Sequence, residues 1–442
     1  MALISDRVGA SFELAESVSP EEGIVSTRIF VDDEIHREEL DRVFARSWLF
    51  IGHETEVPAK GDYVVRRMGH DNVIMARGED HAVRVLLNQC RHRGMQVCRA
   101  ELGNASHFRC PYHGWVYKNT GRLAGVPLYK DVYGSNLRIA EIGLRQPRAA
   151  SYGGLVFACW DEGASSLEDY LGDARWYLDL LLARTNAGME VVGPPQRWVA
   201  GMNWKLGADN FCGDGYHVWT LHRHAYEMGV IPENAVRNGH VISTSHGHGI
   251  RIQTAPADAP IPDYVGMEPE LVPMLDDNLS EAQRAVLRKA VVVHGNIFPN
   301  LSFVLSLAAG DPDDPAGGFA NFRLWQPTSA GESEIWSWFM VDQEASTRYK
   351  EGSRRAYVRT HGVSGTFDQD DLEVWTNITA TARGAVSRES TFNYAMGIGA
   401  DRDESWPGPG TVYASDYSEA NQRAFYAAWL AKMLAGESAN GR

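Results

Sequence analysis

Cysteine is scarce in this sequence: the 442 residues contain only Cys90, Cys98, Cys110, Cys159 and Cys212. If two of the five bind a metal, three remain, which is too few for a disulfide framework, and a reducing compartment fits this usage. Long apolar runs are also missing, and the first residues contain neither a basic stretch nor an apolar one. We therefore expect a soluble, cytoplasmic protein with no membrane span.

Positive charge is also scarce, because the sequence has 42 Lys and Arg residues but 57 Asp and Glu residues. The net charge is therefore −15. This balance speaks against nucleic acid or an anionic membrane as a partner. A G-x-G-x-x-G fingerprint for dinucleotides is absent too, so we do not expect the chain to bind NADH directly. The length suits two or three domains with sizeable cores.

The order of strand and helix signals predicts an α+β protein. Acidic residues at 31–34 mark a helix start, and from about residue 47 short alternating runs separated by Gly and Asp indicate a small all-β domain of about 120 residues. After residue 165 the pattern becomes helical. We expect an N-terminal helical segment at 1–46 that packs with the last domain, an all-β domain at 47–165, and a larger domain at 166–442.

Several signals describe the larger domain further. Residues 318–325 and 334–341 flank a turn and predict an antiparallel strand pair, and the chain ends with an amphipathic helix from Ser418. Ser280 and Gln283 form a capping box that predicts another helix start. The stretch at 255–277 is rich in Pro, Asp and Gly, so we expect a disordered loop or a lid there.

Two pairs of potential metal ligands stand close together in the predicted all-β domain. Cys90 and His92 are one residue apart, Cys110 and His113 are two apart, and seventeen residues separate the pairs. Zinc sites usually space both pairs by two to five residues, which makes a structural zinc site the weaker alternative. The motifs CRH and CPYHGW resemble those of the Rieske [2Fe–2S] cluster. The resemblance puts both cysteines on one iron and both histidines on the other, an arrangement that raises the reduction potential.

Two further residues of the same stretch, Cys98 and His107, have suitable chemistry at unsuitable spacing. We interpret both as structural.

The second constellation lies on a predicted helical stretch at residues 203–224. Asn210, Asp214 and His217 are spaced to share one helix face. His222 follows His217 by five residues, which on a regular helix points the two rings about 140° apart. His224 has the better spacing for an undistorted helix, whereas His222 requires a wide turn or a helix end near residues 218–221. Spacing alone leaves both histidines open.

The pattern N-x-x-x-D-x-x-H-x-x-x-x-H resembles the mononuclear-iron motif of the large (alpha) subunits of aromatic-ring-hydroxylating dioxygenases similar to naphthalene dioxygenase. This resemblance selects His217 and His222 as the imidazole ligands. It places the third ligand in FDQDD, at Asp371, with Asp370 as the second choice. Two His and one carboxylate leave positions on Fe(II) open for O₂. The implied fold is an all-β Rieske domain inserted before a catalytic domain with an antiparallel sheet flanked by helices.

The resemblance also implies residues of a substrate pocket. These are Phe211, His294, Asn296 and His361, of which His361 stands where hydrocarbon-oxidising members often have Phe. Polar groups in such a pocket can contact a carboxylate or hydroxyl on the ring, or can bond to each other and leave the pocket dry. Both a polar contact with the substrate and a dry pocket agree with the sequence.

In the resembled family, electrons cross from the cluster of one chain to the iron of its neighbour in a trimer. An acid at the position of Asp214 bridges a cluster histidine, matching His113, to an iron histidine, matching His217, with Asn210 near the iron. A reductase and a ferredoxin supply the electrons from NADH. A small beta subunit, giving an (αβ)₃ hexamer, is common, and an α₃ trimer is the alternative.

The resemblance therefore predicts a terminal oxygenase that converts an aromatic ring into a cis-dihydrodiol. Single hydroxylation of an aromatic carboxylate, of salicylate or benzoate type, is the alternative chemistry. An electron carrier like a Rieske ferredoxin is the alternative of another class, and the long chain after the cluster motif argues against it. Iron analysis distinguishes an oxygenase from an electron carrier, with about three irons per chain for the oxygenase and about two for the carrier. A binding protein with a relict site is the third interpretation, and it would show no substrate-dependent O₂ uptake.

Overall fold

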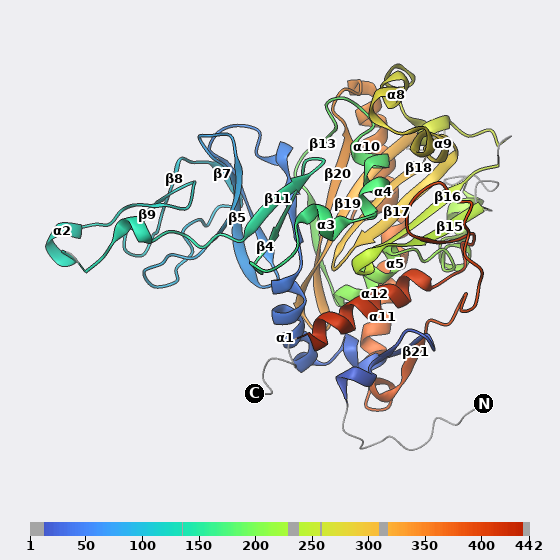
Figure 1. Cartoon of the computed structure of the whole chain (residues 1–442), viewed down its shortest axis with the longest axis horizontal. Helices are drawn as coiled ribbons and strands as arrows, with labels where there is room; N and C mark the ends of the chain where they lie inside the picture. Colours follow the sequence, from blue (N-terminus) through green and yellow to red (C-terminus); the bar gives the residue numbers. More distant parts are fainter. Residues whose placement is uncertain (1–12, 135, 229–237, 257–258, 309–316, 436–442) are drawn as a thin grey trace. The chain divides into compact units, whose positions relative to one another are not determined.

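A computed structural model describes residues 13–134, 136–228, 238–256, 259–308 and 317–435. The chain divides into two compact units, one formed by Met1–Val43 with Glu168–Arg442 and the other by Phe44–Leu167 (Figure 1). None of the described helices has the length and apolarity that crossing a bilayer requires.

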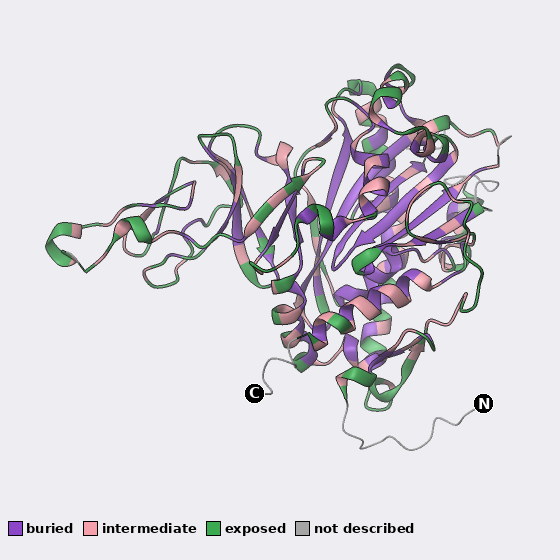
Figure 2. Ribbon diagram, viewed as in Figure 1, coloured by how far each residue is buried: buried purple, intermediate pink, exposed green. Residues whose placement is uncertain are grey.

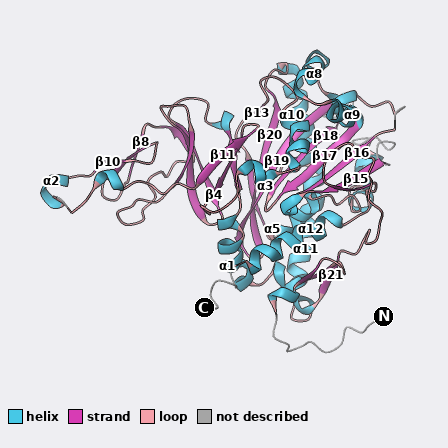
Figure 3. Cartoon of the chain, viewed as in Figure 1, coloured by secondary structure: helices cyan, strands magenta, loops and turns pink. Residues whose placement is uncertain are grey.

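The Phe44–Leu167 unit is built from three small antiparallel sheets, which confirms the predicted all-β domain. The strand orders are β6-β5-β4-β7, β10-β9-β8 and β11-β12-β3. Figure 3 draws the strands in magenta. A core that includes Ile74, Leu86, Phe108, Trp115 and Tyr117 fills the space between the first two sheets. The strands and the helix of this unit are β3 Leu49–His53, β4 Asp62–Met68, β5 Asp71–Arg77, β6 Val83–Leu87, β7 Leu102–Asn104, β8 His107–Arg109, β9 Val116–Lys118, β10 Leu123–Gly125, α2 Tyr129–Val132, β11 Arg148–Tyr152 and β12 Leu155–Cys159.

The other unit is organised around a nine-stranded antiparallel sheet of order β13-β20-β19-β18-β17-β16-β15-β22, with β14 also paired to β20. Its central strands are almost wholly buried (Figure 2), because helices pack on the sheet: α10 on β19, α5 on β17 to β19, and α12 on β15 and β16. The strands are β13 Met189–Val191, β14 Gln196–Ala200, β15 Asn238–Ser243, β16 Gly249–Thr254, β17 Ala290–Ile297, β18 Leu301–Ala308, β19 Gly317–Ser329, β20 Glu332–Asp342 and β22 Thr411–Tyr413. This architecture confirms the predicted antiparallel sheet flanked by helices.

The helices and a small three-stranded sheet complete this unit. The helices are α1 Asp33–Arg42, α3 Leu167–Leu171, α4 Ala174–Leu182, α5 Trp204–Phe211, α6 Val218–Leu221, α7 Arg223–Glu227, α8 Leu275–Asn278, α9 Glu281–Lys289, α10 Thr347–His361, α11 Thr366–Ala382 and α12 Ala420–Leu434. Strands β1 Val18–Ser19, β2 Ile24–Ser26 and β21 Thr391–Asn393 pair in the order β1-β2-β21.

Local sequence signals account for several of these elements. Asp32 caps α1 by accepting hydrogen bonds from the backbone N–H groups of Glu34 and Ile35. The capping box predicted at Ser280 is present at the start of α9. The predicted strand pair is the long hairpin β19–β20, and the predicted C-terminal helix is α12.

Of the two alternatives expected at 255–277, the disordered loop is wrong for the described residues, while the lid stays a prediction. The described part of this stretch forms the 3₁₀ turns Asp263–Gly266 and Pro269–Met274 followed by α8. Val265, Leu271 and Leu275 are buried. These apolar side chains anchor a segment whose proline and acidic residues otherwise favour turns.

The N-terminal helix α1 belongs to the same compact unit as the large sheet. Glu39 of α1 accepts hydrogen bonds from the indole N–H of Trp204 (3.0 Å) on α5 and of Trp429 (2.8 Å) on α12. It also pairs with the ammonium of Lys205 at 2.5 Å, and both charged groups are fully buried. The ammonium lies over the rings of Trp204, Trp429 and Phe30. These contacts connect α1 to α5, the helix that precedes the second group of potential metal ligands.

Candidate metal centres

The two Cys-His pairs lie in loops of nearly the same shape, one between β6 and β7 and the other between β8 and β9. In the first, the Cys90 carbonyl accepts from the Gly94 N–H (2.9 Å) and the Cys90 N–H donates to the Met95 carbonyl (2.8 Å). In the second, the Cys110 carbonyl accepts from the Gly114 N–H (3.0 Å) and the Cys110 N–H donates to the Trp115 carbonyl (2.8 Å). Each loop thus closes five residues after its cysteine.

Glycine is needed at the same place in both loops. Gly94 has φ +76° and Gly114 has φ +72°, a left-handed conformation that a side chain disfavours. These turns bring the four donor side chains together.

The donor set fits a Rieske cluster. Cys90 and Cys110 are buried and form no disulfide, whereas His92 and His113 are half-buried, so the thiols lie inside and the imidazoles outside. The Nδ1 atoms of His92 and His113 face each other at 3.1 Å. Two nitrogens that approach one point from two loops are placed to share an iron ion.

Neighbouring side chains fix the orientation of these donors. The ring of His92 stacks on Trp115 with centroids 5.1 Å apart, and Tyr112 lies on His113 at 3.7 Å. The Tyr117 hydroxyl accepts from the Arg91 N–H at 2.9 Å and lies 3.3 Å from Cys90 Sγ. Because the backbone N–H already occupies the oxygen, the hydroxyl hydrogen is available to the sulfur. This contact could not be predicted from the sequence, because Tyr117 has the pattern of an ordinary inward-facing residue of β9.

The two residues interpreted as structural stay apart from this cluster of donors. Cys98 directs its thiol to the Ala100 carbonyl at 3.4 Å and belongs to the core of the unit. His107 is exposed and bonds to Ser106 Oγ at 3.0 Å.

The second group of donors lies between α5, α6 and α11. The helix predicted through residues 203–224 is broken: α5 ends at Phe211, Gly213 has φ +144°, and a new helix starts after His217. Asn210, Asp214 and His217 therefore do not share one helix face. Short α6 ends at Leu221, so His222 lies at its C-terminal cap. This helix end turns His222 back towards His217, with ring centroids 5.0 Å apart.

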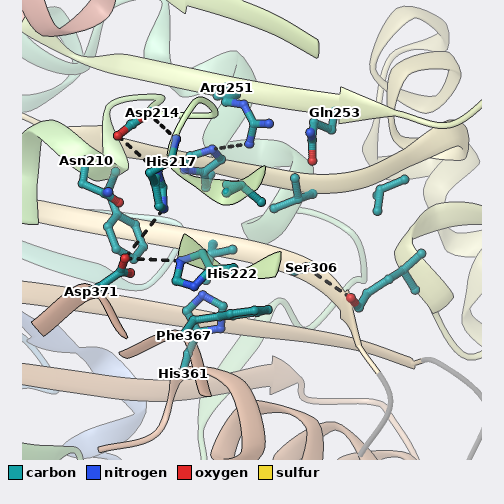
Figure 4. Close-up of a pocket in the computed structure, with 17 residues that line it drawn as sticks. Asn210, Asp214, His217, His222, Arg251, Gln253, Ser306, His361, Phe367 and Asp371 are labelled. Atoms are coloured by element: carbon teal, nitrogen blue, oxygen red, sulfur yellow. Dashed lines mark hydrogen bonds and ion pairs between the residues drawn. The ribbon is translucent and has the colours of Figure 1, made fainter. Parts of the chain in front are cut away.

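His217, His222 and Asp371 form a group that can hold one metal ion, since their ligand atoms all lie within 4.8 Å of one another. Asp371 Oδ1 lies 3.2 Å from His222 Nε2 and 3.7 Å from His217 Nε2 (Figure 4). This oxygen is buried and has no hydrogen-bond partner among the described residues. A buried carboxylate oxygen faced by two imidazole nitrogens, without hydrogen bonds to satisfy it, fits a metal ligand.

Each histidine of this group also has a carboxylate at its other ring nitrogen. Asp214 Oδ2 lies 3.1 Å from His217 Nδ1, and Asp370 Oδ2 lies 3.1 Å from His222 Nδ1. Such carboxylates orient metal-binding imidazoles and fix their tautomer. Asp370, the second choice for the third ligand, thus points to the far edge of the ring, while His224 lies 3.6 Å from Asp370 and outside the group.

Asp214 is held as an anion. Burial disfavours its charge, but His217 and the backbone N–H groups of Tyr216 and His217 outweigh this and hold the pKa of Asp214 at about 2. Its Oδ1 accepts from the Tyr216 N–H at 2.9 Å and the His217 N–H at 3.3 Å. The side chain is therefore fixed by the chain segment that also bears His217.

A cavity opens beside this group. Phe211, His294 and His361, which the sequence placed in a pocket, line this cavity. Asn210 also lines it, and Figure 4 labels Asn210 and His361. Apolar side chains form much of the remaining wall, namely Val218, Val291, Val292, Val304, Leu307 and Phe367.

Asn296 was expected beside them but is absent from this wall. Its amide donates to the Pro299 carbonyl (3.1 Å), and its oxygen accepts from Ser302 Oγ (3.0 Å). The side chain is fully buried. It has satisfied its hydrogen bonds inside the end of β17, so it does not reach the cavity.

The sequence also missed three polar residues of the wall, Arg251, Gln253 and Ser306. Arg251 and Gln253 alternate with Ile250 and Ile252 on β16. A charged residue in such an apolar strand pattern is unusual, and this signal in the sequence could have identified both residues as part of a site.

Comparisons with known proteins agree with this geometry. Residues 47–138 match the model of the Rieske [2Fe-2S] domain, and residues 167–436 match that of the ring hydroxylating alpha subunit (catalytic domain). The chain belongs to the Rieske aromatic-ring-hydroxylating oxygenases, as their alpha subunit. It is an oxidoreductase with a Rieske cluster, a mononuclear iron and O₂ as co-substrate.

Among its relatives is the biphenyl dioxygenase subunit alpha of Paraburkholderia xenovorans (strain LB400), 36% identical, with 94% of this chain and 92% of that protein covered. The N,N-dimethyl phenylurea N-demethylase subunit alpha of Sphingobium sp. (strain YBL2) is also 36% identical, with 93% and 92% covered. The crystal structure of naphthalene 1,2-dioxygenase from Rhodococcus sp. bound to indole matches with a TM-score of 0.93 and 45% identity, covering 96% of this chain and 99% of that one.

Proposed function

We propose that this protein is the terminal oxygenase of a system that adds both atoms of O₂ to a neutral aromatic ring and yields a cis-dihydrodiol. The balance is one arene, one O₂, two electrons and two protons per diol. We further propose Cys90, Cys110, His92 and His113 as the cluster ligands, and His217, His222 and Asp371 as the ligands of Fe(II). The observation that carries the proposal is the cavity with largely apolar walls that opens directly beside the His217, His222 and Asp371 group.

The iron, when bound, supplies the open coordination positions at which O₂ reacts. The chain's own residues do the rest. Phe211 and Phe367 offer ring faces against which an aromatic substrate can stack, and the apolar wall excludes water from the reacting face. Asp370 and Asp214 hold the two imidazoles in place through their Nδ1 atoms.

Electrons reach the site from outside in this proposal. NADH reduces a reductase, a ferredoxin carries the electrons to the cluster, and they pass to the iron of a neighbouring copy in a trimer. Asp214, with Asn210 beside it, connects that cluster to His217. The division of the chain into an all-β unit and a separate catalytic unit supports this scheme, and the relatives are named as alpha subunits. A small beta subunit in an (αβ)₃ hexamer is part of the same proposal.

The test is turnover under ¹⁸O₂. The purified oxygenase, supplied with NADH and a surrogate reductase and ferredoxin, is incubated with naphthalene, biphenyl and N,N-dimethyl phenylurea. Two labelled oxygens in one product establish dihydroxylation, whereas one labelled oxygen, or loss of formaldehyde from the urea, establishes monooxygenation instead. No substrate-dependent O₂ uptake with any arene would refute an oxygenase and leave an electron carrier or a binding protein with a relict site.

A further inference from the structure

One end of the cavity is polar, and its construction carries information about the substrate. Arg251 and Gln253 are two residues apart on β16, so their side chains leave the same face of the strand. Figure 4 shows both on the side of β16 that faces His217 and His222. Both side chains are at least nine-tenths buried, with exposed fractions of 3% and 6%.

A single buried carboxylate, that of Asp416, holds this pair in place. Arg251 donates to Asp416 Oδ1 from Nε (3.0 Å) and lies 2.9 Å from it through Nη2. Gln253 donates to Asp416 Oδ2 through Nε2 at 3.2 Å. The carboxylate can only accept, so the amide nitrogen must be the atom that faces it and the amide oxygen points elsewhere.

His294 completes the polar end. Its Nε2 accepts from Arg251 Nη1 at 3.1 Å, and a second hydrogen bond joins the ring to the Phe211 backbone. Both ring nitrogens are therefore engaged within the protein. His294 closes the wall and offers no hydrogen bond to a substrate.

Some hydrogen-bonding capacity remains. A guanidinium has five N–H groups, and the three contacts with Asp416 and His294 use one each, so two N–H groups of Arg251 have no protein acceptor among the described residues. The Gln253 Oε1 atom likewise accepts no hydrogen bond from the described residues. The cavity wall thus presents a donor and an acceptor side by side.

The charge of this end is balanced. The positive charge of Arg251 faces the negative charge of Asp416 within 3.0 Å, and burial together with Arg251 keeps the pKa of His294 well below its ordinary value, so its ring is neutral. A substrate carboxylate here would be buried without a free counter-charge. The desolvation free energy of the carboxylate would then exceed the free energy that its hydrogen bonds provide. A neutral group that both accepts and donates satisfies the wall without that cost.

From this geometry we infer that the preferred substrate is a neutral arene bearing a hydroxyl or amide group, which Arg251 and Gln253 bind at the end of the cavity. The inference rests on the proposed oxygenase function and specifies its substrate class. Phe211 lies against His294 with ring centroids 6.2 Å apart, and Phe367 lies against His222 at 4.8 Å. An aromatic ring between them has its polar group on Arg251 and Gln253 and its reacting edge towards the iron ligands.

The experiment compares three probes that share one ring system, 2-naphthol, naphthalene and 2-naphthoate, in the reconstituted holoenzyme. We expect kcat/KM for 2-naphthol to exceed that for the other two at least about tenfold, because a wall built for a hydroxyl loses its partners when the hydroxyl is missing. Equal values for naphthalene and 2-naphthol, or a preference for 2-naphthoate, would overturn the inference.

A variant locates the effect. Gln253→Leu should lower the ratio of kcat/KM for 2-naphthol to kcat/KM for naphthalene about tenfold. Thr254→Val is the matched control, because Thr254 follows on the same strand, is only half-buried, and bonds through Oγ1 to the Asn238 carbonyl outside the cavity. The inference is wrong if Gln253→Leu lowers kcat/KM for 2-naphthol and for naphthalene by the same factor.

The two proposals fail separately. Absence of O₂-dependent product from every probe contradicts the oxygenase function itself. Oxidation of all three at similar rates leaves that function intact and refutes only the assignment of the polar end. The wild-type comparison stands even if Gln253→Leu does not fold.

Discussion

The Nδ1 atom of His222 lies 3.1 Å from Asp370 Oδ2, while its Nε2 atom lies 3.2 Å from Asp371 Oδ1. Two consecutive acids of α11 thus meet opposite edges of one imidazole. The helix places successive side chains about 100° apart, so the ring can sit between them. One acid can bind the metal while its neighbour orients the histidine.

We predict that Asp370→Asn lowers iron affinity about 10- to 100-fold, because the carboxylate that fixes the His222 tautomer is lost. Iron per chain after dialysis against a chelator measures this. Glu373→Gln on the same helix, whose side chain is exposed, is the control and should retain iron like the wild type. Equal retention in both variants would mean that Asp370 does not support the ligand.

For Asp214 we predict a different phenotype. Asp214→Asn should keep the cluster spectrum and the iron but lose about 10- to 100-fold in turnover, because it neutralises the anion that orients His217 and that we propose as the link to the neighbouring cluster. Single-turnover kinetics with pre-reduced cluster, followed by loss of its visible absorption, separates slow electron delivery from slow binding. Full turnover with both metals present would contradict the assigned role.

Tyr117→Phe removes the hydroxyl 3.3 Å from Cys90 Sγ. A hydrogen bond to the sulfur stabilises the more negative, reduced cluster, so its loss should lower the reduction potential. At about 1 kcal/mol for one hydrogen bond, the change is about 40 mV for one electron. A spectroelectrochemical titration measures it, and Tyr63→Phe, in the same core but with its hydroxyl bonded to Cys98, should leave the potential unchanged. An unaltered potential in Tyr117→Phe would show that the hydroxyl does not donate to the sulfur.

The buried pair of Lys205 and Glu39 should dominate the stability of the α1 attachment. Lys205→Met leaves the carboxylate of Glu39 buried without its ammonium partner, and breaking a buried pair from one side costs about 3–5 kcal/mol. Denaturant unfolding followed by circular dichroism measures the loss. Arg37→Gln, an exposed position on α1, should stay within about 0.5 kcal/mol of the wild type. Similar losses in the two variants would refute the role of the buried pair.

Asp209 provides a pH signature. Burial raises the pKa of this carboxyl to about 7 against the opposing hydrogen bonds from Tyr426 and Tyr394, with Asp214 and Glu419 adding to the rise. The folded state therefore holds a proton that the unfolded chain releases near pH 3.8, so stability from this group is complete below about 3.8 and is lost as pH rises to about 7. In the Asp209→Asn variant, the unfolding midpoint should decrease less steeply than in the wild type as the pH rises from 5 to 7.5. An unchanged slope would show that Asp209 ionises normally.

What the sequence determined by itself is local. The Cys-His pairs, the capping box of α9, the hairpin β19–β20 and the helix α12 depend on residues a few positions apart, and such patterns can be recognised without knowing the rest of the fold. The two-domain order followed from the same signals because strand and helix periodicities differ along the chain.

Only the tertiary structure decided the contacts between distant residues. The end of α6 turned His222, and not His224, towards Asp371, which is about 150 positions away, and the register of α11 separated Asp371 from Asp370. The polar end of the cavity brings Asp416 to Arg251 across a sequence separation of 165. Packing of side chains from separate elements fixes such contacts, and no local propensity encodes them.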